Sequence, residues 1–290
     1  MRGRVPEQWN PEAVRIWQGD NSGGQLVDRA SISALDHGFT VADGVFETLK
    51  VVPGGPIALS RHLRRLGDSA QVLHLPTPDI SVIRTAVAEV VAAWQGDGGV
   101  LGRLRITYTA GEAPLGSERG DGSPTLVVAV TDTVPWPDTT TAVTVPWTRN
   151  ERSAVAGAKT TSYAENVVAL RAARERGASE ALLANTVGDL CEGTGTNVFV
   201  VVDGRVLTPP LSSGCLPGIT RELVLEWCDV REETLPLSVL ESADEVFLTS
   251  STRDVHPVVR LDDREWSEPG SVSADVRREF AARIAHDIDP

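Results

Sequence analysis

Residues 191–208 read CEGTGTNVFVVVDGRVLT and carry the clearest fold signal in the chain. Two short apolar segments, Asn197–Val202 and Arg205–Thr208, are rich in β-branched residues, and only Asp203-Gly204 separates them. A two-residue Asp-Gly connection favours the type I′ turn of a β-hairpin. The stretch therefore predicts two antiparallel strands, preceded by a polar loop that contains one carboxylate, Glu192.

The remainder of the C-terminal half predicts more strands and helices around this hairpin. A helix is expected after Lys159, with Gly177 as its C-terminal stop. Its apolar side chains at helical spacing are Ala164, Val167, Val168 and Ala172. The other expected strands are 141–145, 181–184, 245–249 and 255–260, and the other expected helices are about 220–227 and 272–285.

The N-terminal half predicts a smaller α+β unit. Pro53-Gly54-Gly55-Pro56 indicates a turn between strands 45–52 and 57–59. Ser60 is expected to cap a helix whose apolar stripe is Leu63, Leu66, Ala70 and Leu73. A second helix is expected to start at Thr77-Pro78, and strands at 101–109 and 125–131.

Two prolines in residues 134–138 prevent a regular element and favour a linker. We therefore expect three segments in the chain. These are an N-terminal domain at 1–133, a linker at 134–140 and a C-terminal domain at 141–290.

Composition narrows the class of protein. The chain has 290 residues, 41% hydrophobic and 23% charged, with a net charge of −13, so a nucleic-acid surface and a basic membrane-binding face are not expected. No apolar run is long enough for a membrane helix, and the N-terminus lacks a secretory signal. The three cysteines lack metal-ligand spacing. We expect a cytoplasmic protein without a bound metal.

Lysine is rare in this chain. It occurs only at Lys50 and Lys159, so arginine supplies 27 − 2 = 25 of the basic residues. A primary amine can form an imine, which a guanidinium cannot. Small residues precede Lys159 and two threonines follow it, a setting that suits a lysine directed into a cavity. The alternative is a surface lysine at a helix start.

Two other segments have the chemistry of a binding site. Glu192 precedes a buried strand, where it could hold a protonated ring nitrogen or simply be a turn carboxylate. Leu216-Pro217-Gly218-Ile219-Thr220 opens a helix whose unpaired N–H groups favour a phosphate, although an ordinary helix start has the same pattern. Thr249-Ser250-Ser251-Thr252 offers further hydroxyl groups, or is a polar loop.

Two strands each present a polar face. Arg103, Arg105, Thr107 and Thr109 alternate with apolar residues, and Phe46, Thr48 and Lys50 share a face of the earlier strand. Such faces could bind a substrate carboxylate, with Lys50 as a second cation, or could be solvated.

Taken in order, several stretches resemble the class IV aminotransferase family, the fold-type IV pyridoxal-phosphate enzymes. The resemblance extends over about residues 24 to 262. The stretches that carry it are Asp36-His37-Gly38, Asp43-Gly44-Val45-Phe46-Glu47-Thr48, His62-Leu63-Arg64-Arg65-Leu66, Lys159, Glu192-Gly193-Thr194-Gly195-Thr196-Asn197-Val198-Phe199 and Leu216-Pro217-Gly218-Ile219-Thr220-Arg221.

This resemblance implies an α+β or α/β architecture of two domains, the smaller N-terminal and the larger C-terminal, barrel-like and flanked by helices. It implies that Lys159 is the catalytic residue and holds pyridoxal 5′-phosphate as a Schiff base, and that Glu192 faces the pyridine nitrogen. The implied phosphate-binding residues are Arg65, Gly218, Ile219, Thr220 and Ser251, with Thr252 beside them. The implied substrate-pocket residues are Phe46, Thr48 and Arg105.

The resemblance also implies a small-molecule amino substrate and a homodimer with the site near the subunit interface. Residues 159–166 and 249–253 are more similar to the aminodeoxychorismate lyase branch, which makes 4-aminobenzoate and pyruvate from 4-amino-4-deoxychorismate for folate synthesis. The alternative is an aminotransferase that acts on branched-chain or D-amino acids, or on R-amines, with a 2-keto acid. Glu47 is shared with the transaminases, whereas Tyr163-Ala164 departs from the Asn-Tyr pair of branched-chain enzymes.

Overall fold

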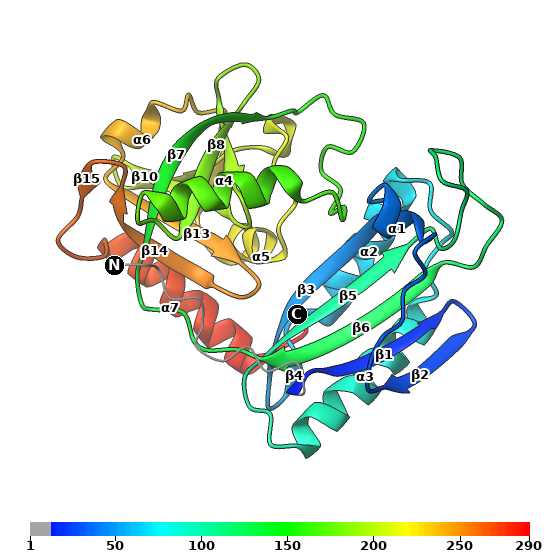
Figure 1. Cartoon of the computed structure of the whole chain (residues 1–290). Helices are drawn as coiled ribbons and strands as arrows, with labels where there is room; N and C mark the ends of the chain where they lie inside the picture. The colour runs from blue at the N-terminus through cyan, green and yellow to red at the C-terminus, as the bar shows by residue number, and fades with distance from the viewer. Residues whose placement is uncertain (1–12) are drawn as a thin grey trace. The chain divides into compact units, whose positions relative to one another are not determined.

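The structure, a computed structural model, describes residues 13–290, whose contacts divide into two units (Figure 1). The N-terminal unit contains residues 13–135, 158–162 and 288–290, and the C-terminal unit contains 136–157 and 163–287. The division after Pro135 falls inside the segment expected to be a linker. Lys159 belongs to the short segment 158–162 that packs with the N-terminal unit, although the residues before and after this segment belong to the other unit.

The N-terminal unit is built on a six-stranded antiparallel sheet with strand order β2-β1-β6-β5-β3-β4. Helices α2 and α3 pack on the sheet, and the short helix α1 precedes β3. The bounds are β1 Arg15–Asp20, β2 Gly23–Val27, α1 His37–Thr40, β3 Gly44–Val52, β4 Gly55–Pro56, α2 Leu59–Val72, α3 Ile80–Gly96, β5 Gly102–Thr109 and β6 Thr125–Asp132.

Apolar and polar side chains alternate along β3 and β5, so the sheet has a core face and a polar face. Leu49 and Ile106 are fully buried against apolar residues of the two helices, such as Leu66. Because successive side chains of a strand point to opposite sides, Phe46 and Arg105 lie on the other face of the sheet. This confirms the two faces expected from the sequence.

The start of α2 differs from the expectation. Ser60 is not the N-cap, because the helix begins at Leu59 after Ala58, which has left-handed backbone angles. The carboxylate of Asp289 instead accepts hydrogen bonds from the Ser60 N–H at 2.7 Å and from the Ser60 hydroxyl at 2.6 Å. The expected strand 57–59 is also wrong, since the strand after the turn is Gly55–Pro56. A cap from 229 residues away leaves no signal in the local sequence.

The second helix starts later than expected. The N-cap of α3 is Asp79, whose side chain accepts from the N–H groups of Ser81 and Val82, so Thr77-Pro78 precedes the helix. A carboxylate that satisfies two free N–H groups is a stronger start signal than the proline directly before it.

The C-terminal unit contains a mixed nine-stranded sheet with order β12-β11-β10-β13-β14-β7-β8-β9, and β15 pairs with β14. Helix α4 packs on β7 and β8, while α5 and α7 pack near β13 and β14 (Figure 1). The strands are β7 Thr140–Arg149, β8 Glu180–Asn185, β9 Leu190–Gly193, β10 Asn197–Val202, β11 Arg205–Thr208, β12 Val230–Glu232, β13 Glu245–Ser250, β14 Asp254–Leu261 and β15 Arg264–Glu265. The helices are α4 Ala164–Glu175, α5 Ile219–Trp227, α6 Val239–Ser242 and α7 Ser271–His286.

The predicted hairpin is confirmed. Strands β10 and β11 pair in antiparallel register, with Val202 opposite Arg205. Asp203 and Gly204 both have positive φ, 50° and 73°, as a type I′ turn requires. Val198 and Val200 of β10 are fully buried, so this hairpin anchors the core of the unit.

The buried face of α4 was predicted wrongly. Val167 and Val168 are 64% and 53% exposed, whereas Asn166, Ala169 and Ala173 are buried. The reason is a pair of hydrogen bonds. The Asn166 side chain bonds to Arg149 and Thr194 inside the unit, and these contacts fix the rotation of the helix about its axis. Alanines on the same face let α4 approach β7 and β8 closely.

Within residues 13–290, no helix combines the length and apolar character needed to cross a membrane. The same residues contain no cluster of three His, Cys, Asp or Glu side chains placed to hold a metal.

Candidate active site

The segment that carries Lys159 is attached to the edge of β3. The Phe46 N–H donates to the Lys159 carbonyl at 3.0 Å, and the Thr161 N–H donates to the Gly44 carbonyl at 2.8 Å. On the other side, the Lys159 N–H donates to the hydroxyl of Ser69 in α2 at 3.1 Å. The lysine backbone is therefore fixed by a strand and a helix of the N-terminal unit.

The loop before β3 is also held firmly. Asp43 accepts two 2.6 Å hydrogen bonds from the Arg119 guanidinium and lies 3.0 Å from His37 Nδ1. Burial acts to raise the pKa of Asp43, but Arg119 and His37 outweigh it and hold the pKa below the usual value. The Thr161 hydroxyl donates to the Ala42 carbonyl at 2.8 Å, so the lysine segment is tied to this ordered loop.

The aromatic ring of Phe46 brings two cations together. Lys159 Nζ lies 4.4 Å from the ring centroid, and Arg105 Cζ lies 3.7 Å from it. Arg105 is opposite Thr48 in the β3–β5 ladder, and its Nε donates to the Thr107 hydroxyl at 3.2 Å. A guanidinium beside a primary amine can bind an acidic group while the amine reacts.

Lys50 is farther along the same face, opposite Arg103 in the ladder. Thr48 and Lys50 therefore share the face of Phe46 and Arg105, as expected.

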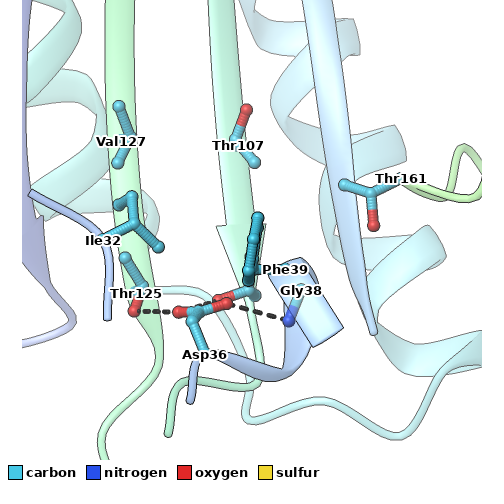
Figure 2. A pocket seen from close by; sticks show the side chains of 9 residues that line it. Ile32, Asp36, Gly38, Phe39, Thr107, Thr125, Val127 and Thr161 are labelled. Carbon is cyan, nitrogen blue, oxygen red and sulfur yellow. Dashed lines mark hydrogen bonds between the residues drawn. The ribbon is translucent and has the colours of Figure 1, made fainter. Parts of the chain in front are cut away.

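A cavity of about 260 Å³ opens on this face of the N-terminal unit, and Figure 2 shows its lining. The buried Asp36 carboxylate is already satisfied, because the Gly38 N–H and the hydroxyls of Thr109 and Thr125 donate to it. The remaining lining residues are Ile32, Phe39, Thr107, Val127 and Thr161. The pocket is therefore small and lined by apolar side chains and hydroxyl groups, and Thr161 of the lysine segment forms part of its wall.

Arg65 lies on the core face, in contact with a buried carboxylate. Its Nε donates to Glu47 Oε1 at 2.8 Å and its Nη2 donates to Glu47 Oε2 at 2.6 Å. His62 Nδ1 is 2.6 Å from the same Oε2. Burial alone would raise the pKa of Glu47, but Arg65, together with His62, lowers it to about 2. Burial lowers the pKa of His62, so the histidine is neutral and donates to an ionised Glu47.

In the C-terminal unit, Glu192 belongs to the short strand β9 and is buried. The Leu216 N–H donates to Oε2 at 2.9 Å, and Arg149 Nε lies 2.9 Å from Oε1. The Arg149 contact is an ion pair rather than an aligned hydrogen bond, because its N–H does not point at the oxygen. The carboxylate is thus held through both oxygen atoms.

The loop before α5 is fixed by Asn197. The Asn197 side-chain amide donates to the Leu216 carbonyl at 2.8 Å, while Leu216 itself donates to Glu192. A Cβ atom at position 218 would lie 1.9 Å from Asn197 Oδ1, so only glycine fits there. The carboxylate and the start of α5 are therefore one connected structure.

The start of α5 has the donors that a phosphate needs. Gly218 is the N-cap without a side-chain cap bond, and Ile219 and Thr220 begin the helix, so their N–H groups have no acceptor within it. Thr249 is opposite Asn197 in the β10–β13 ladder, and its buried hydroxyl has no partner among the described residues. Ser251 and Thr252 follow in the turn after β13. This set of donors fits the phosphate of pyridoxal phosphate.

The structure groups the expected site residues within each unit. Lys159, Phe46 and Arg105 lie together in the N-terminal unit, with Thr48 and Lys50 on the same sheet face. Arg65 contacts Glu47 on the opposite face of β3. Glu192 and the 216–220 segment are joined in the C-terminal unit, and Ser251 and Thr252 follow β13.

Sequence reasoning missed the residues that hold these groups. The one available signal was Glu47, whose place among the core-facing residues of β3 requires buried partners. The partners missed are Ser69, His62, Arg149, Asn166 and Asn197.

The family model described as amino-transferase class IV matches residues 44–261. The chain is 30% identical over 276 residues to the D-alanine aminotransferase of Bacillus licheniformis, covering 88% of this chain and 93% of that protein. It is 31% identical over 256 residues to the bifunctional aminodeoxychorismate lyase / D-amino acid transaminase of Mycobacterium tuberculosis, covering 77% of this chain and 83% of that one.

Among solved structures, a fold IV-transaminase from Curtobacterium pusillum superposes with a TM-score of 0.85 and 30% identity. The match covers 95% of this chain and 99% of the transaminase. The expected fold is therefore confirmed.

Proposed function

This chain belongs to the class IV aminotransferases, which are pyridoxal-phosphate enzymes, and from that premise we propose that it transfers an amino group between an amino acid and a 2-keto acid. The observation that carries the proposal is the pair of cations on the Phe46 ring, which favours a substrate with a carboxylate. Lys159 supplies a reactive amine, and Arg105 supplies a carboxylate-binding group beside it. Amino acids and keto acids both have the carboxylate that this arrangement favours.

The cofactor would be held by residues of both sequence halves. We assign the covalent attachment of the cofactor to Lys159 Nζ, and the contact with the cofactor ring nitrogen to Glu192. Glu47 fixes the Arg65 guanidinium, and Arg65 is assigned the phosphate together with Gly218, Ile219, Thr220, Ser251 and Thr252. When bound, pyridoxal phosphate supplies an aldehyde that joins to amines and a ring that accepts electrons.

Each residue then has a specific task. Lys159 Nζ would act as the base that takes the proton from the substrate α-carbon and holds it for return to the bound substrate and cofactor. Arg105 binds the substrate carboxylate, with Thr48 and Lys50 on the same face. The cavity lined by Ile32, Phe39 and Val127 is proposed to receive the substrate side chain, because Thr161 of the lysine segment forms part of its wall.

Aminodeoxychorismate lyase is the second candidate. The Mycobacterium tuberculosis relative is named for both reactions, and residues 159–166 of this chain are similar to the lyase branch. Both reactions begin with loss of the same proton to Lys159, so the cofactor-binding residues do not separate them. We also propose a homodimer, the common state of the family, with the site near its interface.

The deciding experiment supplies purified protein with D-alanine, L-leucine or an R-amine and 2-oxoglutarate, and separately with 4-amino-4-deoxychorismate. We expect glutamate and a new carbonyl product from at least one amino donor. Formation of 4-aminobenzoate and pyruvate without amino transfer would replace the proposal with the lyase. Absence of both products would reject the two candidates together.

Attachment of the cofactor to Lys159 is tested independently of substrate. Borohydride reduction followed by peptide mass spectrometry should find the cofactor on Lys159 and none on Lys50. Lys159→Ala should remove the visible absorbance of the bound cofactor and lower turnover by about 10³-fold or more. A reduced adduct elsewhere in the chain would contradict the assignment.

A further inference from the structure

Arg149 contacts Glu192 and a second partner. It is the last residue of β7, and its side chain is 19% exposed. Nε lies 2.9 Å from Glu192 Oε1, and Nη2 donates to Asn166 Oδ1 at 3.0 Å. Its third contact, with Glu165 at 3.8 Å, involves a carboxylate that is 82% exposed and so contributes little.

Asn166 is itself fixed in position. It lies on the buried face of α4, and its Nδ2 donates to the Thr194 carbonyl at 2.6 Å. Thr194 is two residues after Glu192, in the turn that leads to β10. The side chain of Asn166 therefore connects Arg149 to the same loop that carries Glu192.

Glu180 fixes the other side of this loop. The buried Glu180 carboxylate accepts from the Thr194 N–H and from the hydroxyls of Thr194 and Thr196. The backbone around Glu192 is thus held by Glu180 and Asn166, which leaves the carboxylate itself to be oriented by Arg149 and the Leu216 N–H.

From these contacts we infer that Arg149, held by Asn166, is a positioning residue that orients and neutralises Glu192 for its interaction with the cofactor ring nitrogen. This inference rests on the proposed function, in which Glu192 has that partner. A buried carboxylate needs a compensating charge, and Arg149 supplies it from the side of Oε1. The Leu216 N–H donates to Oε2, so the carboxylate group cannot rotate without losing one of these contacts.

The alternative is that Arg149 merely joins β7 to α4. The two roles differ in one measurable respect. A purely structural arginine affects every cofactor equally, whereas a positioning arginine affects only those that interact with Glu192 through a ring nitrogen.

The test measures binding of pyridoxal phosphate and of its analogue with C–H in place of the ring nitrogen to cofactor-depleted protein. Wild type should bind the natural cofactor at least about tenfold more tightly, the size expected for a hydrogen bond to a charged group. In Arg149→Met, which retains length without charge, the ratio of the two dissociation constants should fall to within about threefold of one. Arg149→Lys, which restores the charge, should recover part of the ratio.

The matched control is Arg176→Met. Arg176 also pairs with a carboxylate of the C-terminal unit, Asp262 at 2.8 Å, but does not contact Glu192. Its removal should leave the ratio of dissociation constants at the wild-type value. If Arg149→Met does not fold, Asn166→Ser tests the same role, because it removes the support of Arg149 and retains the charge of the arginine. The ratio of the two dissociation constants should again fall by several-fold.

The outcomes separate the inference from the function on which it rests. A wild-type ratio near one would reject the role of Glu192 and the inference with it. A large wild-type ratio that Arg149→Met or Asn166→Ser leaves unchanged would overturn the inference alone, even if both affinities decrease.

Discussion

At the scale of single residues, the most consequential feature of this protein is a buried carboxylate held by charged and polar partners. Glu47 is fully buried in the core of the N-terminal unit, where a carboxylate is tolerated only with partners. Arg65 binds both of its oxygens, and His62 adds a third contact. Such a cluster is costly to break, because removal of one member leaves the others buried and uncompensated.

The Glu47 cluster predicts a specific acid sensitivity. The pKa of Glu47 is lowered from 4.5 to about 2 in the folded protein. The stability that this shift provides is therefore complete above about pH 4.5 and is lost as pH falls from 4.5 to 2. The total is about 3 kcal/mol, at about 1.4 kcal/mol per pKa unit. Urea unfolding at a series of pH values should show this slope, and Glu47→Gln should flatten it between pH 4.5 and 2.

His62 predicts a second loss of unfolding free energy as pH falls. Its pKa is lowered by burial, so the unfolded chain binds a proton that the folded chain does not when pH falls below about 6.5. Stability should begin to decrease there. An unfolding free energy that stays constant from pH 7 to pH 3 would contradict both assignments.

Gly218 lies so close to a neighbouring side chain that only glycine fits at this position. A Cβ atom at this position would overlap the side chain of Asn197, whose amide holds the 216–218 loop. Gly218→Ala should therefore weaken pyridoxal-phosphate binding by about tenfold or more, measured by absorbance titration. Gly195→Ala is the matched control, since a Cβ at position 195 meets open space. Equal effects of the two substitutions would show that the close approach at 218 is unimportant.

At the scale of elements, the most unusual feature is the start of α2. This helix carries His62, Arg65 and Ser69, and thus supports both the Glu47 cluster and the lysine segment. Its own first turn is capped by the last residues of the chain, through Asp289. The C-terminus therefore contributes to the geometry around Lys159 through α2.

Asp289→Ala should lower the thermal midpoint by about 2–4 °C, since loss of an N-cap costs about 1 kcal/mol. Asp289→Asn should retain most of the stability, because an amide oxygen can still accept from the Ser60 N–H. Differential scanning calorimetry of both variants measures the difference. An Asp289→Ala protein with the wild-type midpoint would show that the contact contributes nothing to α2.

At the scale of the whole molecule, single-chain burial leaves large apolar side chains in contact with solvent. Phe39, Leu115 and Val41 of the N-terminal unit are 74%, 78% and 47% exposed. Exposed apolar side chains that form one contiguous patch commonly mark a surface that another chain covers. They agree with the homodimer that we propose.

The dimer predicts a mass of twice 31.0 kDa by light scattering or sedimentation. Phe39→Ser should weaken the association at least several-fold in a dilution series, whereas Val168→Ser, on the exposed face of α4, serves as the comparison. A wild-type protein that remains at 31 kDa at micromolar concentration would exclude the homodimer.

The sequence alone determined the elements whose signals are local. The Asp203-Gly204 hairpin, the alternating faces of β3 and β5 and the stop of α4 at Gly177 all follow from backbone preferences of a few adjacent residues. The order of motifs was enough to indicate the family and its cofactor.

Only the tertiary structure decided which side chains support the site. Arg149, Asn166 and Ser69 reach their partners across 43, 28 and 90 positions, respectively, and Asp289 reaches Ser60 across 229. The same contacts of Asn166 turned α4 away from the face that its valines predict. Local propensity cannot contain such information, because the free energy of a buried polar group depends on partners that chain folding alone brings within hydrogen-bonding distance.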